Sequence, residues 1–99
     1  MKVLLATQDL IFRSKLGVVV RELGEMARDE ASSDVVVLDV EAPGAQERIR
    51  GLVERGVAVL AYGPHVRAEL LRAAREAGAT AVPNSQVEQQ LRHLLATST

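Results

Sequence analysis

The chain has 99 residues, enough for one domain with a single hydrophobic core and too few for a second. Lys and Arg number 12 against 13 Asp and Glu, so the net charge favours neither nucleic acid nor an anionic membrane as a partner. The sequence has no cysteine, which excludes disulfides, thiolate catalysis and sulfur ligation of a metal.

The first predicted element is a buried strand over residues 2–6, a short apolar run that ends at the polar residues Thr7, Gln8 and Asp9. The run is too short for a signal peptide or a membrane span. We therefore expect a cytoplasmic protein.

A helix follows this strand. Phe12, Leu16, Val19 and Leu23 recur at spacings of four and three, which places them on one helical face, and Gly24 is the expected end of the helix. The pattern then weakens. We expect a short edge strand at 25–28 and a polar loop at 29–33.

The central element is the run from Asp34 to Asp39, in which four apolar residues stand between two carboxylates. A continuous apolar run indicates a strand buried on both faces, as in a covered parallel sheet. Ligands of open α/β sheets bind beyond the carboxyl ends of the strands. The functional surface is therefore expected around Asp39 and the turn through Gly44.

The next helix is predicted over 45–55, with Ile49, Leu52 and Val53 facing inward, and Gly56 ends it. A second buried strand follows at 57–61. Pro64 is expected at the first helical position of the third helix, where its missing N–H costs nothing.

The third helix is expected to present Val66, Leu70, Ala73 or Ala74, and Ala77 to the core. A brief last strand at 79–82 precedes the final helix, for which Ser85 and Glu88 match a capping box. The inward face of this helix comprises Val87, Leu91, Leu94 and Leu95. Residues 97–99 are expected to form a frayed tail.

Strands that alternate with helices at this spacing indicate right-handed βαβ units and a parallel sheet covered on both faces. The predicted fold is a three-layer α/β domain over residues 1–96. Its sheet is mostly parallel, with four or five strands.

The order of motifs resembles a response-regulator receiver domain over most of the chain. In receivers the third strand reads Asp, four apolar residues, Asp, and a Pro-Gly-type turn follows, as at 34–39 and Pro43-Gly44 here. The steps at 21–24 and 77–79 are also similar. The resemblance implies a flavodoxin-like strand order of 2-1-3-4-5, with a shortened second βα unit, and makes Asp39 the candidate phosphoacceptor.

The chain departs from receivers where receiver chemistry is performed. Thr7 and Gln8 stand where receivers have an acidic pair that helps to hold magnesium. The stretch 61–63 lacks the receiver's switch Ser or Thr, and the stretch 83–85 lacks its Lys. Asp39 with Asp9 is a thin ligand set for Mg²⁺. The chain therefore resembles a degenerate receiver, or pseudo-receiver, and no cofactor is expected unless Asp39 is phosphorylated with magnesium.

The candidate crevice is assigned to residues at the carboxyl edge of the sheet: Thr7, Gln8, Asp9, Asp39, Tyr62, Gly63, His65 and Ser85. Each has a structural alternative. Asp39 could cap its own turn, Tyr62 could complete the core, His65 could be a solvent-exposed first-turn residue, and Ser85 could be only a helix cap. His65 has no metal-ligand spacing with His93 or Asp39.

Three functions remain open from the sequence. The favoured one is a non-catalytic signalling or protein-interaction module that binds a partner protein or a second copy of itself. The alternatives are an atypical phosphoacceptor that uses Asp39 and a small-ligand or anion-binding domain around Gly63 to His65.

Overall fold

The computed structural model describes residues 1–97 and shows a parallel five-stranded sheet in the order β2-β1-β3-β4-β5. The predicted α/β class and the strand order implied by the resemblance are confirmed. The strands are β1 (Lys2–Ala6), β2 (Glu25–Met26), β3 (Val35–Asp39), β4 (Ala58–Gly63) and β5 (Thr80–Pro83). The helices are α1 (Leu10–Leu23), α2 (Ala45–Glu54), α3 (Ala68–Glu76) and α4 (Val87–Ala96), with a 3₁₀ turn at Asn84–Gln86.

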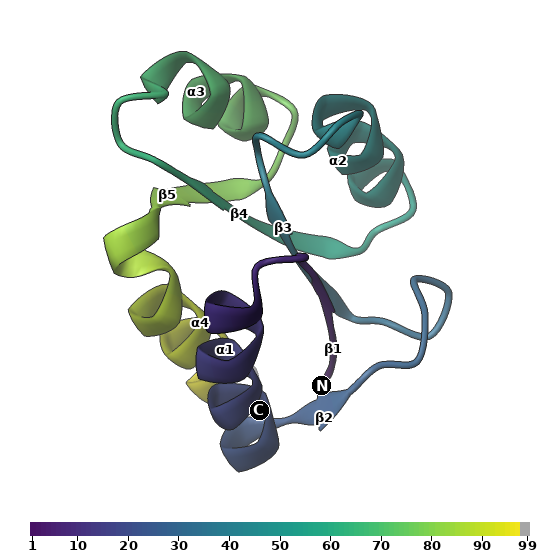
Figure 1. The fold of residues 1–99 in the computed structure, drawn as a ribbon. Coiled ribbons are helices and arrows are strands. Elements are labelled where there is room, and N and C mark those ends of the chain that lie inside the picture. The colour runs from purple at the N-terminus through teal and green to yellow at the C-terminus, as the bar shows by residue number, and fades with distance from the viewer. Residues whose placement is uncertain (98–99) are drawn as a thin grey trace.

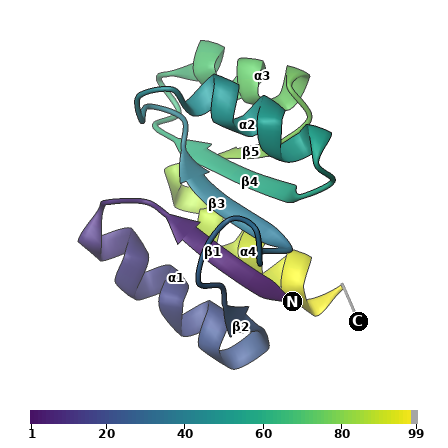
Figure 2. The same ribbon diagram turned by 90° about the vertical axis from the view of Figure 1, so that its right-hand side faces the viewer.

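The helices cover the two faces of the sheet in pairs. Helices α1 and α4 lie on one face, and α2 and α3 lie on the other (Figures 1 and 2). Alternate residues of β3 therefore enter different cores: Val35 and Val37 pack with α1 and α4, whereas Val36 and Leu38 pack with α2 and α3. This two-sided burial explains why β3 reads as an unbroken apolar run.

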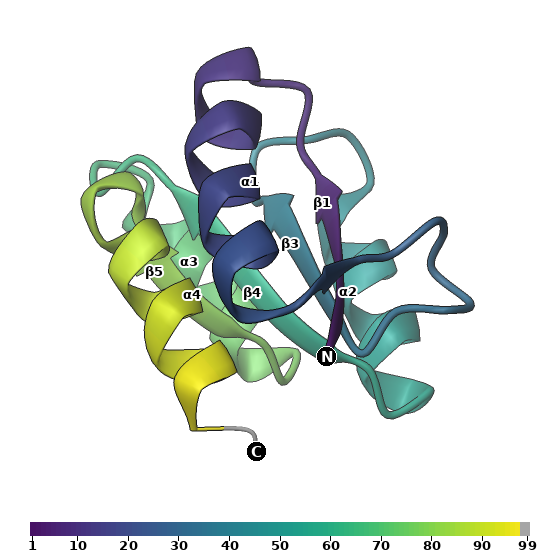
Figure 3. The same cartoon turned by 90° about the horizontal axis from the view of Figure 1, so that it is seen from below.

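The second βα unit is reduced to two paired residues and a loop. Strand β2 pairs with β1 only at Glu25 and Met26, and residues 27–34 contain no helix. The loop is visible as a projection between β2 and β3 in Figure 3. Its turn is held by the Ser33 hydroxyl, which donates to the carbonyls of Asp29 and Glu30 at 2.9 and 2.8 Å. The predicted shortening of this unit is therefore confirmed.

The start of α3 differs from the prediction. The helix begins at Ala68, and Pro64 lies in the turn before it, where its carbonyl accepts a hydrogen bond from the Arg67 N–H at 2.9 Å. Val66, predicted to face the core, is 71% exposed. The proline fits the turn as well as a first helical position, and no side chain caps the helix at Arg67 to mark the true start.

Two further details of the helices were predicted wrongly. Leu23 is exposed, and Val20 takes its place in the buried face of α1. Ser85 lies in the 3₁₀ turn, and α4 starts at Val87 without a side-chain cap, so the capping box with Glu88 does not form. Thr97 caps the end of α4 by bonding to the His93 carbonyl, and the rest of the predicted tail lies outside the described residues.

Within residues 1–97, no helix is long and apolar enough to cross a membrane.

Candidate functional site

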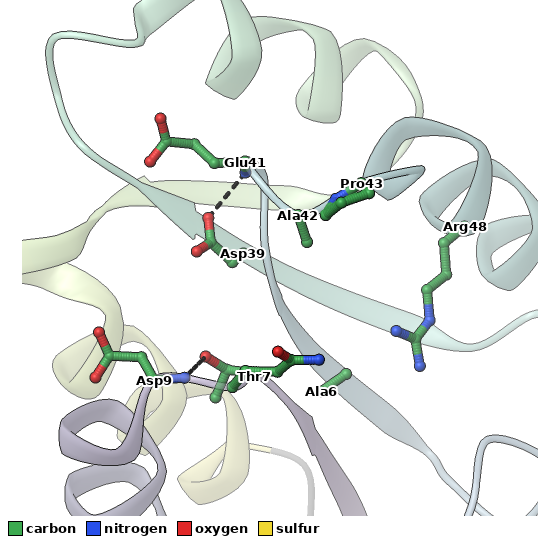
Figure 4. Close-up of a pocket in the computed structure, with 9 residues that line it drawn as sticks. Ala6, Thr7, Asp9, Asp39, Glu41, Ala42, Pro43 and Arg48 are labelled. Atoms are coloured by element: carbon green, nitrogen blue, oxygen red, sulfur yellow. Dashed lines mark hydrogen bonds between the residues drawn. The ribbon is translucent and has the colours of Figure 1, made fainter.

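A pocket of about 530 Å³ opens at the carboxyl edge of the sheet, between the loop after β1 and the loop after β3. Both loops follow parallel strands that pair residue for residue, so their first residues arrive at the same edge. Figure 4 shows Asp9 and Thr7 below the opening and Asp39 above it. The residues around the pocket are Ala6, Thr7, Gln8, Asp9, Asp39, Glu41, Ala42, Pro43 and Arg48.

Asp39 closes the turn that follows its own strand. Its Oδ1 accepts a hydrogen bond from the Glu41 N–H at 2.8 Å (Figure 4). Its carbonyl accepts one from the Ala42 N–H at 3.1 Å. This is the local side-chain-to-backbone bonding for which aspartate is favoured in turns. The left-handed conformation of Gly44, with φ of 73°, then leads the chain into α2. The half-buried carboxylate therefore has one oxygen committed to the backbone.

Asp9 is the N-cap of α1. Its Oδ1 accepts hydrogen bonds from the N–H groups of Ile11 and Phe12 at 2.9 and 3.2 Å. An aspartate in this role accepts hydrogen bonds from amides that have no partner within the helix, and its negative charge interacts favourably with the positive end of the helix dipole. The second carboxylate at this edge thus also serves the backbone.

Thr7 is buried, and its hydroxyl forms a short hydrogen bond with the hydroxyl of Tyr62. The same Thr7 oxygen accepts the Asp9 N–H at 3.3 Å. The Tyr62 ring packs against Phe12, with the ring centroids 4.8 Å apart. Burial raises the pKa of Tyr62, and the negative charges of Asp39 and Asp9 act in the same direction, while the Thr7 bond partly opposes them.

Tyr62 therefore belongs to the core and does not line the pocket. Only 1% of its surface is exposed, and it joins the cluster between the sheet and α1 and α4. The assignment of Tyr62 to the crevice fails because residues on β4 alternate between faces, which turns this side chain toward α1. Its hydroxyl supports the site from beneath by holding Thr7.

Three other sequence candidates lie away from this pocket. Gly63 is buried, and a side chain there would collide with Cγ2 of Val40, so a packing requirement accounts for the glycine. His65 is exposed in the turn before α3. Since α3 begins three residues later, His65 is not in the first turn of a helix, and the anion site expected there has no helix N-terminus to form it. Ser85 is exposed in the 3₁₀ turn.

Two charged residues of the pocket were missed from the sequence. Glu41 follows Asp39 in the β3 loop and pairs with Arg67 at 3.1 Å. Arg48, an exposed residue of α2, lines the pocket and binds Glu30 at 2.5 Å. Position in the helix predicts that Arg48 is exposed but gives no sign of its partner, because Glu30 lies in an irregular loop.

The donor set at this edge does not fit magnesium. Mg²⁺ needs carboxylate oxygens and waters in near-octahedral geometry. One carboxylate oxygen of Asp9 and one of Asp39 already accept hydrogen bonds from backbone amides, and the Thr7 hydroxyl is hydrogen-bonded to Tyr62. No group of three His, Asp or Glu residues suited to a metal occurs among residues 1–97.

A comparison with solved structures identifies the fold. A structure described as a BeF3-activated DrrB receiver domain superposes with a TM-score of 0.79 over 96% of this chain and 93% of that one, at 23% sequence identity. The chain has the receiver fold. HP1043, an orphan response regulator of H. pylori, also shows it, with a TM-score of 0.71, 17% identity and coverage of 97% of this chain and 91% of that one.

The sequence comparisons found no match. No protein-family model matches the chain, and no curated protein matches it by sequence. The receiver resemblance drawn from the residue pattern is confirmed by the fold.

Proposed function

We propose that this chain is a receiver-like signalling module that binds a partner protein and does not perform receiver phosphotransfer. The observation that supports the proposal is that the polar side chains at the carboxyl edge of the sheet are already hydrogen-bonded within the protein. Asp39 holds its own turn, Asp9 caps α1, and Thr7, at a position where receivers carry an acidic residue, is tied to Tyr62. These groups organise the backbone of the receiver fold.

The charge around Asp39 also argues against a stable phosphoryl group. Among the residues that line the pocket, Asp9 and Glu41 add negative charge, and Arg48 is the one cation. That cation is already paired with Glu30. A phosphoryl group carries close to two negative charges. Arg48, whose Nε already binds Glu30, is a single cation beside two further carboxylates, so the charge of a phosphorylated Asp39 would be only partly compensated here.

Phosphorylation of Asp39 is the second candidate, and one observation favours it. The carboxylate lines a pocket of about 530 Å³, which leaves room for a small phosphodonor. The two candidate functions differ in whether Asp39 becomes phosphorylated.

Intact-mass measurement after incubation with Mg²⁺ and acetyl phosphate separates them. We expect no phosphate adduct that depends on Asp39. The matched variants are Asp39→Asn and Glu41→Gln, which remove one carboxylate each from the same turn. An adduct on the wild type and on Glu41→Gln, absent from Asp39→Asn, would establish the phosphoacceptor and overturn the proposal.

The receiver resemblance favours a second copy of the chain as one partner, through the surface of α4 and β5. Sedimentation velocity at micromolar concentration tests this part of the proposal. A dimer is expected, and a monomer at every concentration would contradict it.

A further inference from the structure

The edge of β1 is only half covered by β2. Every second residue of β1 directs its backbone groups toward this edge, and the carbonyls of Met1 and Val3 accept hydrogen bonds there from the amides of Glu25 and Ala27 at 2.9 and 2.8 Å. Leu5 is the next residue of this set. Strand pairing with β2 ends at Val3, and within residues 1–97 no backbone hydrogen bond joins Leu5 to the loop that follows β2.

A groove of about 260 Å³ runs along this uncovered part of the edge. Its lining comprises residues 4–8 together with Arg13 and Arg48. Arg13 lies on α1 and Arg48 on α2, and Figure 2 shows these helices on opposite faces of the sheet. The open edge is therefore flanked by one arginine on each face.

Both arginines retain hydrogen-bonding capacity. Arg13 is exposed and forms no ion pair within the described part of the chain. Arg48 binds Glu30 through Nε, and its Nη groups form no hydrogen bond with residues 1–97. A guanidinium carries five donors, so each arginine can still bind a carboxylate.

We propose that an extended peptide segment with two consecutive acidic residues binds here as an additional strand on the edge of β1. An unpaired strand edge offers main-chain donors and acceptors to such a segment. Successive side chains of a strand point to opposite faces of the sheet, so two neighbouring acidic residues would reach Arg13 on one face and Arg48 on the other. This inference names a partner for the interaction module proposed above and rests on that proposal.

The test uses the full chain labelled with ¹⁵N and three synthetic hexapeptides with blocked ends. The first is Thr-Val-Asp-Glu-Val-Thr, and the second replaces its two acids with Asn and Gln. The third keeps the acids but carries N-methyl groups on every peptide nitrogen, which removes its backbone donors. We expect the first peptide to shift the amide resonances of Leu5 and Thr7 and to bind roughly fivefold tighter than the second, because charge-assisted bonds add to the strand pairing. The third should not bind.

Arg13→Gln is the main protein variant, because this side chain has no ion pair to lose. It should weaken binding of the acidic peptide about threefold and leave the neutral peptide unchanged. Arg50→Gln, on the same helix as Arg48 but outside the groove, is the matched control and should bind as the wild type does.

Equal binding of acidic and neutral peptides, binding of the N-methylated peptide, or shifts confined to other amides would each overturn the inference. So would concentration-dependent shifts at Leu5 and Thr7 without peptide, which would assign the edge to a second copy. A phosphate adduct on Asp39 is a separate result that would overturn the proposed function, so the two failures are distinguishable.

Discussion

Thr7 illustrates which properties of a single residue can be predicted from the sequence: its place at the sheet edge can, but its hydrogen bond to Tyr62 cannot. The parallel strand ends place Thr7, Gln8, Asp9 and Asp39 at one edge, and the structure brings these four together around one pocket. The hydrogen bond between Thr7 and Tyr62 joins residues 55 positions apart, and no local pattern specifies it. This hydrogen bond can be recognised only when the registers of β1 with β3 and of β3 with β4 are known.

The pH dependence of stability tests the burial of Tyr62. Its pKa is raised above the ordinary value of 10.0, chiefly by burial. Above pH 10 the unfolded chain therefore loses the phenolic proton while the folded chain keeps it. The free energy of unfolding should fall from pH 10 upward, by at most about 1.4 kcal/mol per pH unit, until the folded pKa is passed.

Urea denaturation of the wild type and Tyr62→Phe at several pH values measures this effect. The free energy of unfolding of the wild type minus that of Tyr62→Phe should be constant below pH 10 and should fall above it. Since the chain has one tyrosine, absorbance of the tyrosinate reports the same titration directly. A midpoint at or below pH 10 would show that the ring is not buried.

Gly63 provides a second test at the residue scale. A Cβ at this position would collide with the buried Val40 side chain, so Gly63→Ala should cost about 1–3 kcal/mol of stability. Gly51→Ala is the matched control: a Cβ there meets nothing within 4 Å, and alanine in the interior of α2 should stabilise by about 0.5–1 kcal/mol. Both values come from chemical denaturation. Equal effects of the two substitutions would contradict the packing role of Gly63.

The loop between β2 and β3 is the element in which this chain departs most from a repeating βα pattern. Its shortness was predictable from the polar, non-periodic stretch at 29–33. Its attachment was not, because Glu30 reaches two arginines of the following helix region, Arg48 at 2.5 Å and Arg55 at 2.9 Å. These ion pairs tie the loop to α2 at the place where the chain has no helix.

Removal of the Glu30 charge should loosen the loop. Hydrogen bonds from Arg55 and Arg48 lower the pKa of Glu30 below its ordinary value of 4.5. The stabilisation that these two arginines give to the folded state is therefore fully present above pH 4.5. It is lost as the pH falls through the lowered pKa of Glu30. Because the pair is partly exposed, Glu30→Gln should cost less than about 1 kcal/mol at neutral pH.

Hydrogen exchange is the sensitive measurement for this loop. The Ser33 N–H donates to the Glu30 carbonyl at 3.1 Å and should exchange faster in Glu30→Gln than in the wild type. Glu54→Gln removes a carboxylate from the end of α2 that forms no ion pair within residues 1–97, and it should leave this exchange unchanged. Equal exchange in all three proteins would show that the ion pairs do not hold the loop.

At the scale of the whole molecule, apolar runs that alternate with amphipathic helices were sufficient to predict the layers, whereas the strand order followed from the receiver resemblance. Two of the errors lie at helix starts, where α3 and α4 have no side-chain cap to mark them. These errors moved His65 and Ser85 into a crevice that they do not line. The receiver fold thus follows from the sequence, whereas the composition of the site required the register and the turns.

Asp39 and Asp9 hold backbone turns at the sheet edge, and we propose that they do not bind a metal. The most direct test is a Mg²⁺ titration followed at the amides of Glu41 and Ile11, which donate to Asp39 and Asp9. We expect no saturable shift at either amide up to about 10 mM Mg²⁺, because the free carboxylate oxygens are too few to form a site. A saturable shift at both amides, abolished in Asp39→Asn, would contradict it.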